Sequence, residues 1–184
     1  MEVRTAHVVE GAVRGDLSCW ERLVDRYWDM VWAVVRAHGL SGSDAADVVQ
    51  TSWLRLIEHL PRVKDPDRIG GWLATTARRE SVLTRRRLAR CAPSDEIHVL
   101  VDEVGPDVDA QLLRDERDAA LWTGFRRLKP HDQMLLRLLT TDPVPSYAEI
   151  AAALDMPVGS IGPKRARALA RLRRELVGTP ALAA

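Results

Sequence analysis

The basic residues Lys164, Arg167, Arg171 and Arg174 recur at intervals of three and four near the C-terminal end of the sequence. At this spacing their side chains form one stripe along a helix. Guanidinium and ammonium groups in such a stripe neutralise phosphates and reach base edges in the major groove of DNA. The stripe therefore predicts binding to duplex DNA, although a solvated amphipathic helix is the commoner role of a basic stripe taken alone.

The helix that carries this stripe also has an apolar face on which it can pack. Apolar residues share one side of a helical wheel: Ile161, Ala168, Leu169, Leu172 and Leu176. Pro163 falls in the first turn, where its missing N–H costs nothing. Arg165 lies near the apolar side, so its aliphatic stem is expected to pack there. The segment thus predicts a helix with one buried and one basic face.

The residues before this helix complete a helix-turn-helix pattern. Ser146 caps a first helix, whose inward positions are Ile150, Ala151 and Leu154. The turn lies at residues 158–159, and Asp155 occupies a position where such turns often carry Gly. Asp tolerates a left-handed backbone better than most residues do. The complete pattern favours DNA binding over a solvated helix.

Charge is unevenly distributed along a chain whose net charge is only +1. The net charge is −3 over residues 1–61, +6 over 62–92, −7 over 93–123 and +5 over 124–184. Two basic blocks separated by an acidic one indicate a polyanionic partner.

Few other kinds of chemistry are compatible with the sequence. The two cysteines, Cys19 and Cys91, have no CxxC spacing, and the five histidines are scattered, so no metal, disulfide or cofactor is expected. No P-loop, GxSxG, HExxH or GxGxxG occurs, which argues against an enzyme. No N-terminal apolar run has the length of a signal peptide or membrane span, which predicts a soluble, cytoplasmic protein without membrane insertion.

Helical periodicity recurs along the chain and predicts an all-α fold. In the first half, helices are expected from Asp16 or Ser18, from Ser41, and after a loop at 61–71 as far as Arg90. In the second half, helices are expected over residues 112–128, from Pro130, from Ser146, and over the basic segment. We expect two small helical domains joined by a flexible acidic linker, with these boundaries: residues 1–92, linker 93–110, residues 111–177 with the helix-turn-helix, and a tail at 178–184.

Two segments of the first half resemble a known family. DAADVVQTSWLRL at 44–56 looks like the polymerase-binding segment of the extracytoplasmic-function (ECF) group of bacterial sigma factors, and WLATTARRE at 72–80 looks like its promoter-melting helix. PVGSIGPKRARAL at 157–169 matches the second conserved domain of that family. The resemblance covers about residues 10–92 and 111–177 in the family's order. It implies a non-enzymatic subunit that binds core RNA polymerase and directs it to promoters.

The resemblance also implies roles for particular residues of the first half. Docking on the β′ clamp helices of the polymerase, with the β subunit as a further partner, would involve Asp47, Gln50, Trp53 and Leu54. The loop from Arg62 to Arg68 would capture a flipped base of the melted minus-10 element. The residues expected to contact this single strand are Arg62, Lys64, Arg68, Trp72, Arg78, Arg79 and Arg86. Trp72 shares a wheel face with Ile69, so burial is expected for it more than stacking, and Arg79 replaces an Asn that is common in the family.

The second half would bind the minus-35 element as duplex DNA. The residues assigned to this contact are Ser160, Lys164, Arg165, Arg167, Arg171 and Arg174. An anti-sigma factor stays open as a further partner. The alternative function is a self-sufficient helix-turn-helix regulator with an N-terminal sensor or dimerisation domain, but the first half has a basic melting-type helix of its own. A nucleic-acid-processing enzyme would need metal ligands or paired carboxylates at a useful spacing, which the sequence lacks.

Overall fold

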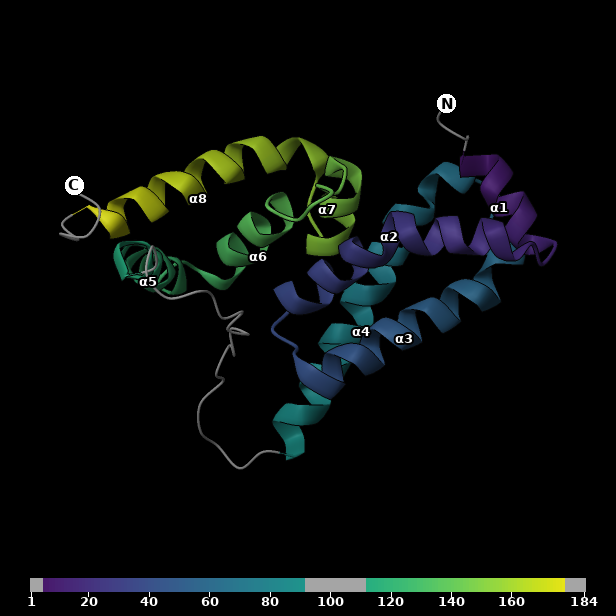
Figure 1. Ribbon diagram of the computed structural model, residues 1–184, viewed down its shortest axis with the longest axis horizontal. Helices are drawn as coiled ribbons and strands as arrows, with labels where there is room; N and C mark the ends of the chain where they lie inside the picture. Colours follow the sequence, from purple (N-terminus) through teal and green to yellow (C-terminus); the bar gives the residue numbers. More distant parts are fainter. Residues whose placement is uncertain (1–4, 92–111, 178–184) are drawn as a thin grey trace.

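The structure, a computed structural model, describes residues 5–91 and 112–177, and within these residues it contains helices and no strand (Figure 1). The expected all-α class is confirmed for this part of the chain. The elements in chain order are α1 (Thr5–Val13), α2 (Leu17–Ala37), α3 (Gly42–His59), the short 3₁₀ helices η1 (Leu60–Arg62) and η2 (Pro66–Arg68), α4 (Ile69–Cys91), α5 (Leu112–Arg126), α6 (Pro130–Leu139), α7 (Tyr147–Leu154), the 3₁₀ helix η3 (Val158–Ser160) and α8 (Ile161–Leu176).

The predicted linker at 93–110 and tail at 178–184 lie outside the described residues. The division of the chain into two domains at these boundaries therefore stays a prediction. None of the described helices has both the length and the apolar character needed to cross a membrane.

The sequence predicted most helix starts but missed the first helix. α2 begins after Asp16, whose carboxylate accepts hydrogen bonds from the Ser18 and Cys19 amides and serves as the N-cap. α3 begins after Ser41 as expected, although that side chain makes no capping bond. α1 was not predicted, and it packs on α2 with its buried residues Val8, Val9 and Ala12.

The segment expected as a loop at 61–71 is more regular than its prolines and glycines indicated. It forms η1 and η2, and α4 already begins at Ile69, which is buried. Asp65 caps η2 by accepting a hydrogen bond from the Asp67 amide, and it also forms an ion pair with Arg68 at 2.9 Å. The predicted minus-10 loop is thus an ordered segment between α3 and α4, and its own hydrogen bonds and ion pair hold its shape.

One large core extends across both halves of the chain. It takes buried side chains from α1 to α4 and from α6 and α7, and it includes Ile161 at the start of α8. In Figure 1, α7 lies between α6 and the helices α2 and α4 of the first half. We call the contact of α7 with α4 and α2, together with that of α6 with α2, the seam.

A second, smaller core lies away from the seam. It consists of Phe125, Leu128, Leu136 and Ala168, from α5, α6 and α8 with the turn between the first two. α8 extends along this cluster, away from the first half (Figure 1). Packing on two clusters leaves one side of α8 free to face solvent.

Candidate promoter and polymerase interfaces

The basic helix α8 presents part of its predicted stripe to solvent: Arg167 and Arg174 are exposed, and Lys164 and Arg171 are half-buried. Ile161 and Ala168 are fully buried, so the predicted apolar face is confirmed. Arg165, Arg167 and Arg174 are exposed, whereas Ser160, Lys164 and Arg171 are half-buried. Arg165 reaches solvent although its position borders the buried side of the helix. The six residues assigned to minus-35 DNA therefore lie on α8 and on Ser160, the residue before it, in two different environments.

The two half-buried cations of the stripe have partners on α6. Arg171 forms an ion pair with Asp132, whose side chain is only 9% exposed. Lys164 Nζ lies 3.4 Å from His131 Nε2, and burial together with the Lys164 charge lowers the pKa of His131. A neutral His131 can accept a hydrogen bond from the ammonium group. Neither partner was predicted, because α6 is more than thirty residues away in sequence.

The segment between α7 and α8 begins at a left-handed residue, and the turn predicted at residues 158–159 lies within the 3₁₀ helix η3. Ser146 and Glu149 form a reciprocal capping box at the start of α7. Asp155 ends α7 in the left-handed conformation, with φ of 55°. Ile150, Ala151 and Leu154 are all buried, as expected for the inward face.

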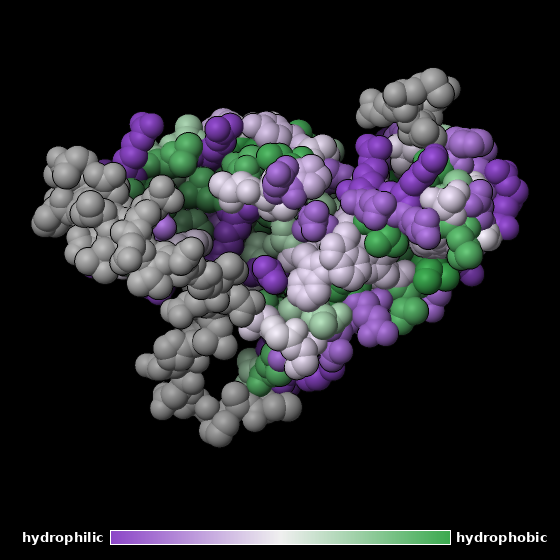
Figure 2. All heavy atoms as spheres, viewed as in Figure 1, coloured by the Kyte–Doolittle hydropathy of each residue, from purple (hydrophilic) through white to green (hydrophobic). Residues whose placement is uncertain are grey.

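The outer side of α3 carries the residues assigned to polymerase binding. Asp47, Gln50 and Leu54 are exposed, and Trp53 is half-buried. Ile57 is 53% exposed, and it extends the apolar surface beyond Leu54. Figure 2 shows hydrophobic side chains reaching the surface along α3. Contiguous exposed apolar groups of this kind mark interaction surfaces.

Tryptophans of α2 enlarge this surface in a way that the sequence analysis missed. Trp28 is 42% exposed and stacks on Trp53, with ring centroids 6.4 Å apart. Trp32 meets Trp28 edge to face at 6.2 Å. The i, i+4 spacing of the two α2 tryptophans was the available signal, but the wheel of α2 alone did not place them beside α3. We call Trp28, Trp53, Leu54 and Ile57 the aromatic face.

The predicted minus-10 loop borders a small cavity of about 170 Å³. The residues assigned to the melted strand that line it are Arg62, Lys64, Arg68 and Trp72. Trp72 is half-buried, and its ring is parallel to that of His59 with centroids 4.4 Å apart. The expectation of burial for Trp72 is therefore met only in part. The His59 ring covers one face of the indole, but the side chain as a whole is half-buried.

The basic residues of α4 are split between solvent and the seam. Arg79 and Arg86 are exposed. Arg78 instead forms an ion pair with Asp155 at 3.2 Å, and its side chain is 21% exposed. Its buried Nε has no hydrogen-bond partner among the described residues. The structure thus separates Arg78 from the other cations that the sequence grouped with it.

A family model and a curated relative both match this chain. The family model for Sigma-70 region 2 matches residues 23–91, which contain the aromatic face, the cavity and α4. The ECF RNA polymerase sigma factor BldN of Streptomyces coelicolor is 27% identical over 176 residues, which are 94% of this chain. The chain spans 66% of the length of that relative.

Two solved structures share the fold. CnrH, solved in complex with the cytosolic domain of CnrY, has a TM-score of 0.58 and 23% identity, over 92% of this chain and 94% of that one. RpoE, solved with the anti-sigma factor NepR from Bartonella quintana, has a TM-score of 0.58 and 16% identity, over 85% of this chain and 96% of that one.

The helical fold and the matched segment define a Sigma-70 region 2 within residues 23–91. Over 94% of its length the chain is also similar to an ECF RNA polymerase sigma factor.

Proposed function

We propose that this chain binds core RNA polymerase and directs it to promoters, where it recognises the minus-35 and minus-10 elements. The observation that carries the proposal is the content of the segment matched by Sigma-70 region 2. Within residues 23–91 it combines an exposed apolar face on α2 and α3 with a basic loop and helix. A self-sufficient regulator does not need a polymerase-binding face and a strand-binding basic helix in the same domain. The sigma-factor function is therefore favoured over that alternative.

Core polymerase binds the outer side of α3 in this proposal. Asp47 and Gln50 supply polar contacts, and the aromatic face supplies the apolar centre. Buried aromatic anchors surrounded by polar groups are typical of protein interfaces. The partner surface is the β′ clamp helices, with the β subunit nearby.

The melted minus-10 strand binds along the loop and α4. The cavity beside Trp72 receives a flipped base, and the exposed Arg62, Lys64 and Arg68 neutralise the phosphates around it. Arg79 and Arg86 continue this basic path along α4, and Arg78 joins it once its side chain is free.

The minus-35 element is bound as duplex DNA by α7, η3 and α8 acting as a helix-turn-helix. The exposed Arg167 enters the major groove, and Arg174, further along α8, contacts a phosphate. Lys164 and Arg171 contact α6, so their side chains are held in fixed positions beside the groove. Ser160 and Arg165 lie at the start of the helix, beside the same groove.

The remaining expectations complete the proposal. The chain comprises two domains at residues 1–92 and 111–177, joined by the linker, and it acts in the cytoplasm with the polymerase. CnrH and RpoE were each solved with a partner, which for RpoE is an anti-sigma factor. By analogy, we propose an anti-sigma factor as a partner of this chain as well.

Reconstituted transcription tests the proposal. Core polymerase is incubated with the purified chain on a library of promoter fragments, and run-off products are sequenced. We expect selected promoters to share two elements and transcripts to need both the core enzyme and this chain. Failure to bind core polymerase, measured by co-migration on a sizing column, would contradict the proposal.

A further inference from the structure

The first turn of α6 has a fixed position beside the recognition helix α8. Gln133 Nε2 donates hydrogen bonds to the carbonyl oxygens of Leu128, at 2.8 Å, and Arg126, at 3.1 Å. These bonds tie the start of α6 to the C-terminal end of α5. Leu136, further along α6, is buried in the smaller core together with Ala168 of α8. The side chains on this turn therefore keep their positions relative to α8.

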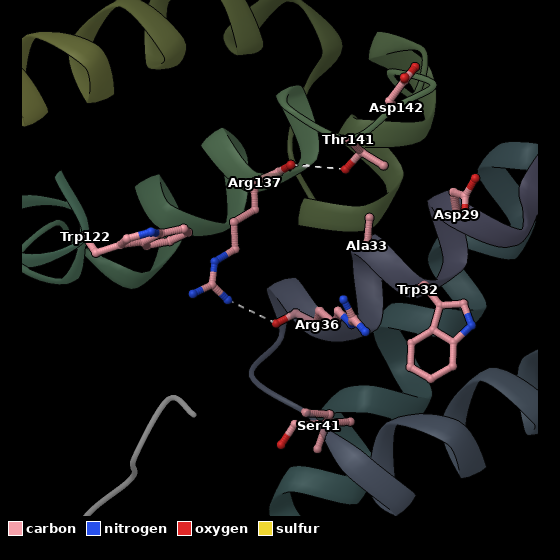
Figure 3. Close-up of a pocket in the computed structure, with 10 residues that line it drawn as sticks. Asp29, Trp32, Ala33, Arg36, Ser41, Trp122, Arg137, Thr141 and Asp142 are labelled. Carbon is pink, nitrogen blue, oxygen red and sulfur yellow. Dashed lines mark hydrogen bonds between the residues drawn. The ribbon is translucent and has the colours of Figure 1, made fainter. Parts of the chain in front are cut away.

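The C-terminal half of α6 is anchored as well. Arg137 donates a hydrogen bond to the Arg36 carbonyl oxygen of α2 at 3.4 Å, and Figure 3 shows its guanidinium extended from α6 toward the end of α2. The same guanidinium lies over the Phe125 ring, 5.5 Å from its centroid. The Thr141 hydroxyl donates to the Arg137 carbonyl oxygen at 3.1 Å (Figure 3). Since both ends of α6 are held, this helix can support side chains of α8.

Lys164 of α8 contacts this support through His131. Lys164 Nζ lies 3.4 Å from His131 Nε2, and both side chains are half-buried. An imidazole with its proton on Nδ1 accepts a hydrogen bond at Nε2. The ammonium group has three N–H groups, so two remain for DNA after one is donated to His131. Arg167, one helical turn further along the stripe, is exposed, so Lys164 borders the same proposed groove.

A lysine needs such a support before it can distinguish one base from another. Its ammonium is a point charge on a flexible stem, and fixing that stem costs about 2 kcal/mol of rotamer entropy. A free lysine therefore serves any nearby phosphate, which carries no sequence information. A lysine held at a base edge can instead donate to the acceptors of a particular base, such as those of guanine. A contact that fixes the Lys164 ammonium favours this second role.

The charges around His131 make this contact depend on pH. Burial lowers the pKa of His131 below its ordinary value of 6.5, the Lys164 charge lowers it further, and Asp132 on α6 opposes both. Arg171 of α8 is paired with Asp132. Among the residues that the structure describes, no charged group of α2 or α7 contributes to the shift of this pKa, although both helices pack against α6.

The direction of this shift sets when the contact exists. In neutral solution His131 is mostly neutral and accepts the hydrogen bond from Lys164. As the pH falls through the lowered pKa of His131, the contact is lost, because an imidazolium has no acceptor and repels the ammonium.

We propose that His131 is the positioning residue for Lys164 in minus-35 recognition: its neutral ring holds the ammonium at one base edge, and its protonated ring releases it. The proposal rests on the proposed function, in which α8 binds the minus-35 element. His131 acts through Lys164 and makes no base contact of its own. One part of promoter selection thereby becomes sensitive to pH, whereas the contacts of Arg167 and Arg174 do not, because guanidinium groups stay protonated.

Binding of the holoenzyme to a panel of minus-35 variants tests the proposal. Each labelled promoter fragment carries one changed base, and the measured quantity is the ratio of the affinities for the best and the changed base. Lys164→Ala should reduce this ratio about three- to tenfold at one position. His131→Ala should reduce it about two- to fivefold at the same position and leave the other positions unchanged. The two substitutions combined should match Lys164→Ala alone, since one residue acts through the other.

His131→Gln is the conservative variant. Its amide oxygen accepts a hydrogen bond from the ammonium and does not titrate, so the native ratio should be retained. In the native chain the ratio should fall as the pH is lowered through the His131 titration, whereas in His131→Gln it should stay constant. His38→Gln is the matched control, because His38 is also a buried histidine with a lowered pKa but contacts the Ala153 carbonyl oxygen of α7. This control should keep the native pH profile.

Nuclear magnetic resonance of the histidine ring protons measures the contact in the free chain, without polymerase or DNA. The His131 signal is identified by its absence from the spectrum of His131→Gln. Lys164→Met keeps most of the stem and removes the charge, so it should raise the pKa of His131. Arg167→Met, one turn further along α8, is the control and should leave that pKa unchanged. The midpoint of this titration sets the pH range of the binding measurements.

The outcomes separate this proposal from the proposed function. A native preference in His131→Ala, or a native ratio that stays constant across the His131 titration, would overturn it. A uniform loss at every minus-35 position would also overturn it, because that is the result of a merely structural role. An unchanged His131 pKa in Lys164→Met would show that the contact does not form. A chain that does not bind core polymerase, or whose holoenzyme selects no minus-35 element, would instead overturn the proposed function.

Discussion

Arg171 and Arg167 are one helical turn apart in the basic stripe, but their surroundings differ. Arg171 neutralises the buried Asp132, whereas Arg167 is exposed and, among the residues that the structure describes, donates to the Pro163 carbonyl oxygen of its own helix. Arg171→Ala leaves a buried carboxylate without its partner, which should lower the free energy of unfolding by about 1–3 kcal/mol. Urea unfolding measures this loss. Arg167→Ala is the control and should change the stability little; equal losses would contradict the assignment.

Arg167→Ala should act on DNA binding instead of on stability. In the holoenzyme, we expect it to cost about 1–3 kcal/mol and to relax the preference at one minus-35 position. Arg174→Ala should weaken binding to all sequences equally, as expected for a phosphate contact. Both variants are measured against a panel of minus-35 sequences at two salt concentrations. Identical, sequence-independent losses would show that the stripe binds only the DNA backbone.

The basic stripe could be predicted from sequence because it depends on spacing within one helix. The partners of that stripe could not. Asp132 and His131 meet α8 only after α6 has packed beside it, and no local pattern indicates which acidic residue will be buried. The same holds for Arg78, which shares the spacing of the other α4 cations and is singled out only by the position of Asp155.

Two serines at helix starts offer a matched comparison. Ser146 forms a capping box with Glu149 at the start of α7, whereas Ser41 precedes α3 without a side-chain capping bond. Ser146→Ala should therefore lower the free energy of unfolding by about 0.5–2 kcal/mol, and Ser41→Ala should have little effect. Chemical denaturation of both variants measures the difference. A larger loss for Ser41→Ala would contradict the capping assignment.

The outer side of α3 allows a test of polymerase binding that spares the fold. Asp47 and Gln50 are exposed, so replacing both with Ala should leave the helix content unchanged in circular dichroism. We expect core polymerase to bind the double variant at least about fivefold more weakly, which corresponds to about 1 kcal/mol. Fluorescence anisotropy of a labelled chain measures the affinity. Glu10→Ala on α1 is the control, and undiminished binding by the double variant would remove α3 from the interface.

Helices with a recognisable start signal or a long apolar stripe were the ones that sequence could predict. α2, α4 and α8 have such stripes, and their starts and ends agree with the structure to within a few residues. α1 was missed because its nine residues are too few for a long apolar stripe and its first turn contains no acidic residue. Its helix depends on packing against α2, which a local pattern does not contain.

The burial of His38 at the seam, 3.2 Å from the Ala153 carbonyl oxygen, predicts a dependence of stability on pH. Burial lowers the pKa of His38 below its ordinary value of 6.5, and the charges of Arg78 and Arg85 lower it further, against a hydrogen bond to the Ala153 carbonyl that raises it. The unfolded chain therefore binds the proton first as the pH falls below 6.5. The stability that neutral His38 contributes is present above that pH and is lost below it.

Urea unfolding at pH 7.5 and pH 5.5 measures this loss. We expect a lower unfolding midpoint at the acidic pH for the native chain. His131 also has a lowered pKa and contributes in the same direction. The His38→Gln variant isolates the part due to His38, and it should show a smaller difference between the two pH values. An unchanged difference would contradict the role of His38 in the seam.

The packing of the two halves on each other could not be predicted from sequence. An apolar stripe shows that a helix face is buried, but it does not identify the helix that covers it. Ala153 and Ile150 fit the inward face of a self-contained helix-turn-helix equally well. Only the structure shows that their helix also covers α4 and α2, so that one core serves both halves.

The two sides of the shared core are synthesised at different times, because α4 precedes α7 in the chain. The ribosome adds about 5–20 residues per second, so the side of α4 from Gly70 to Arg78 emerges about 4–15 s before Glu149 and Asp155, which cover it. During that interval the nascent first half carries an apolar strip that no later residue yet shields. Such a strip is a binding site for chaperones that scan new chains, and the core closes only when α7 has left the exit tunnel.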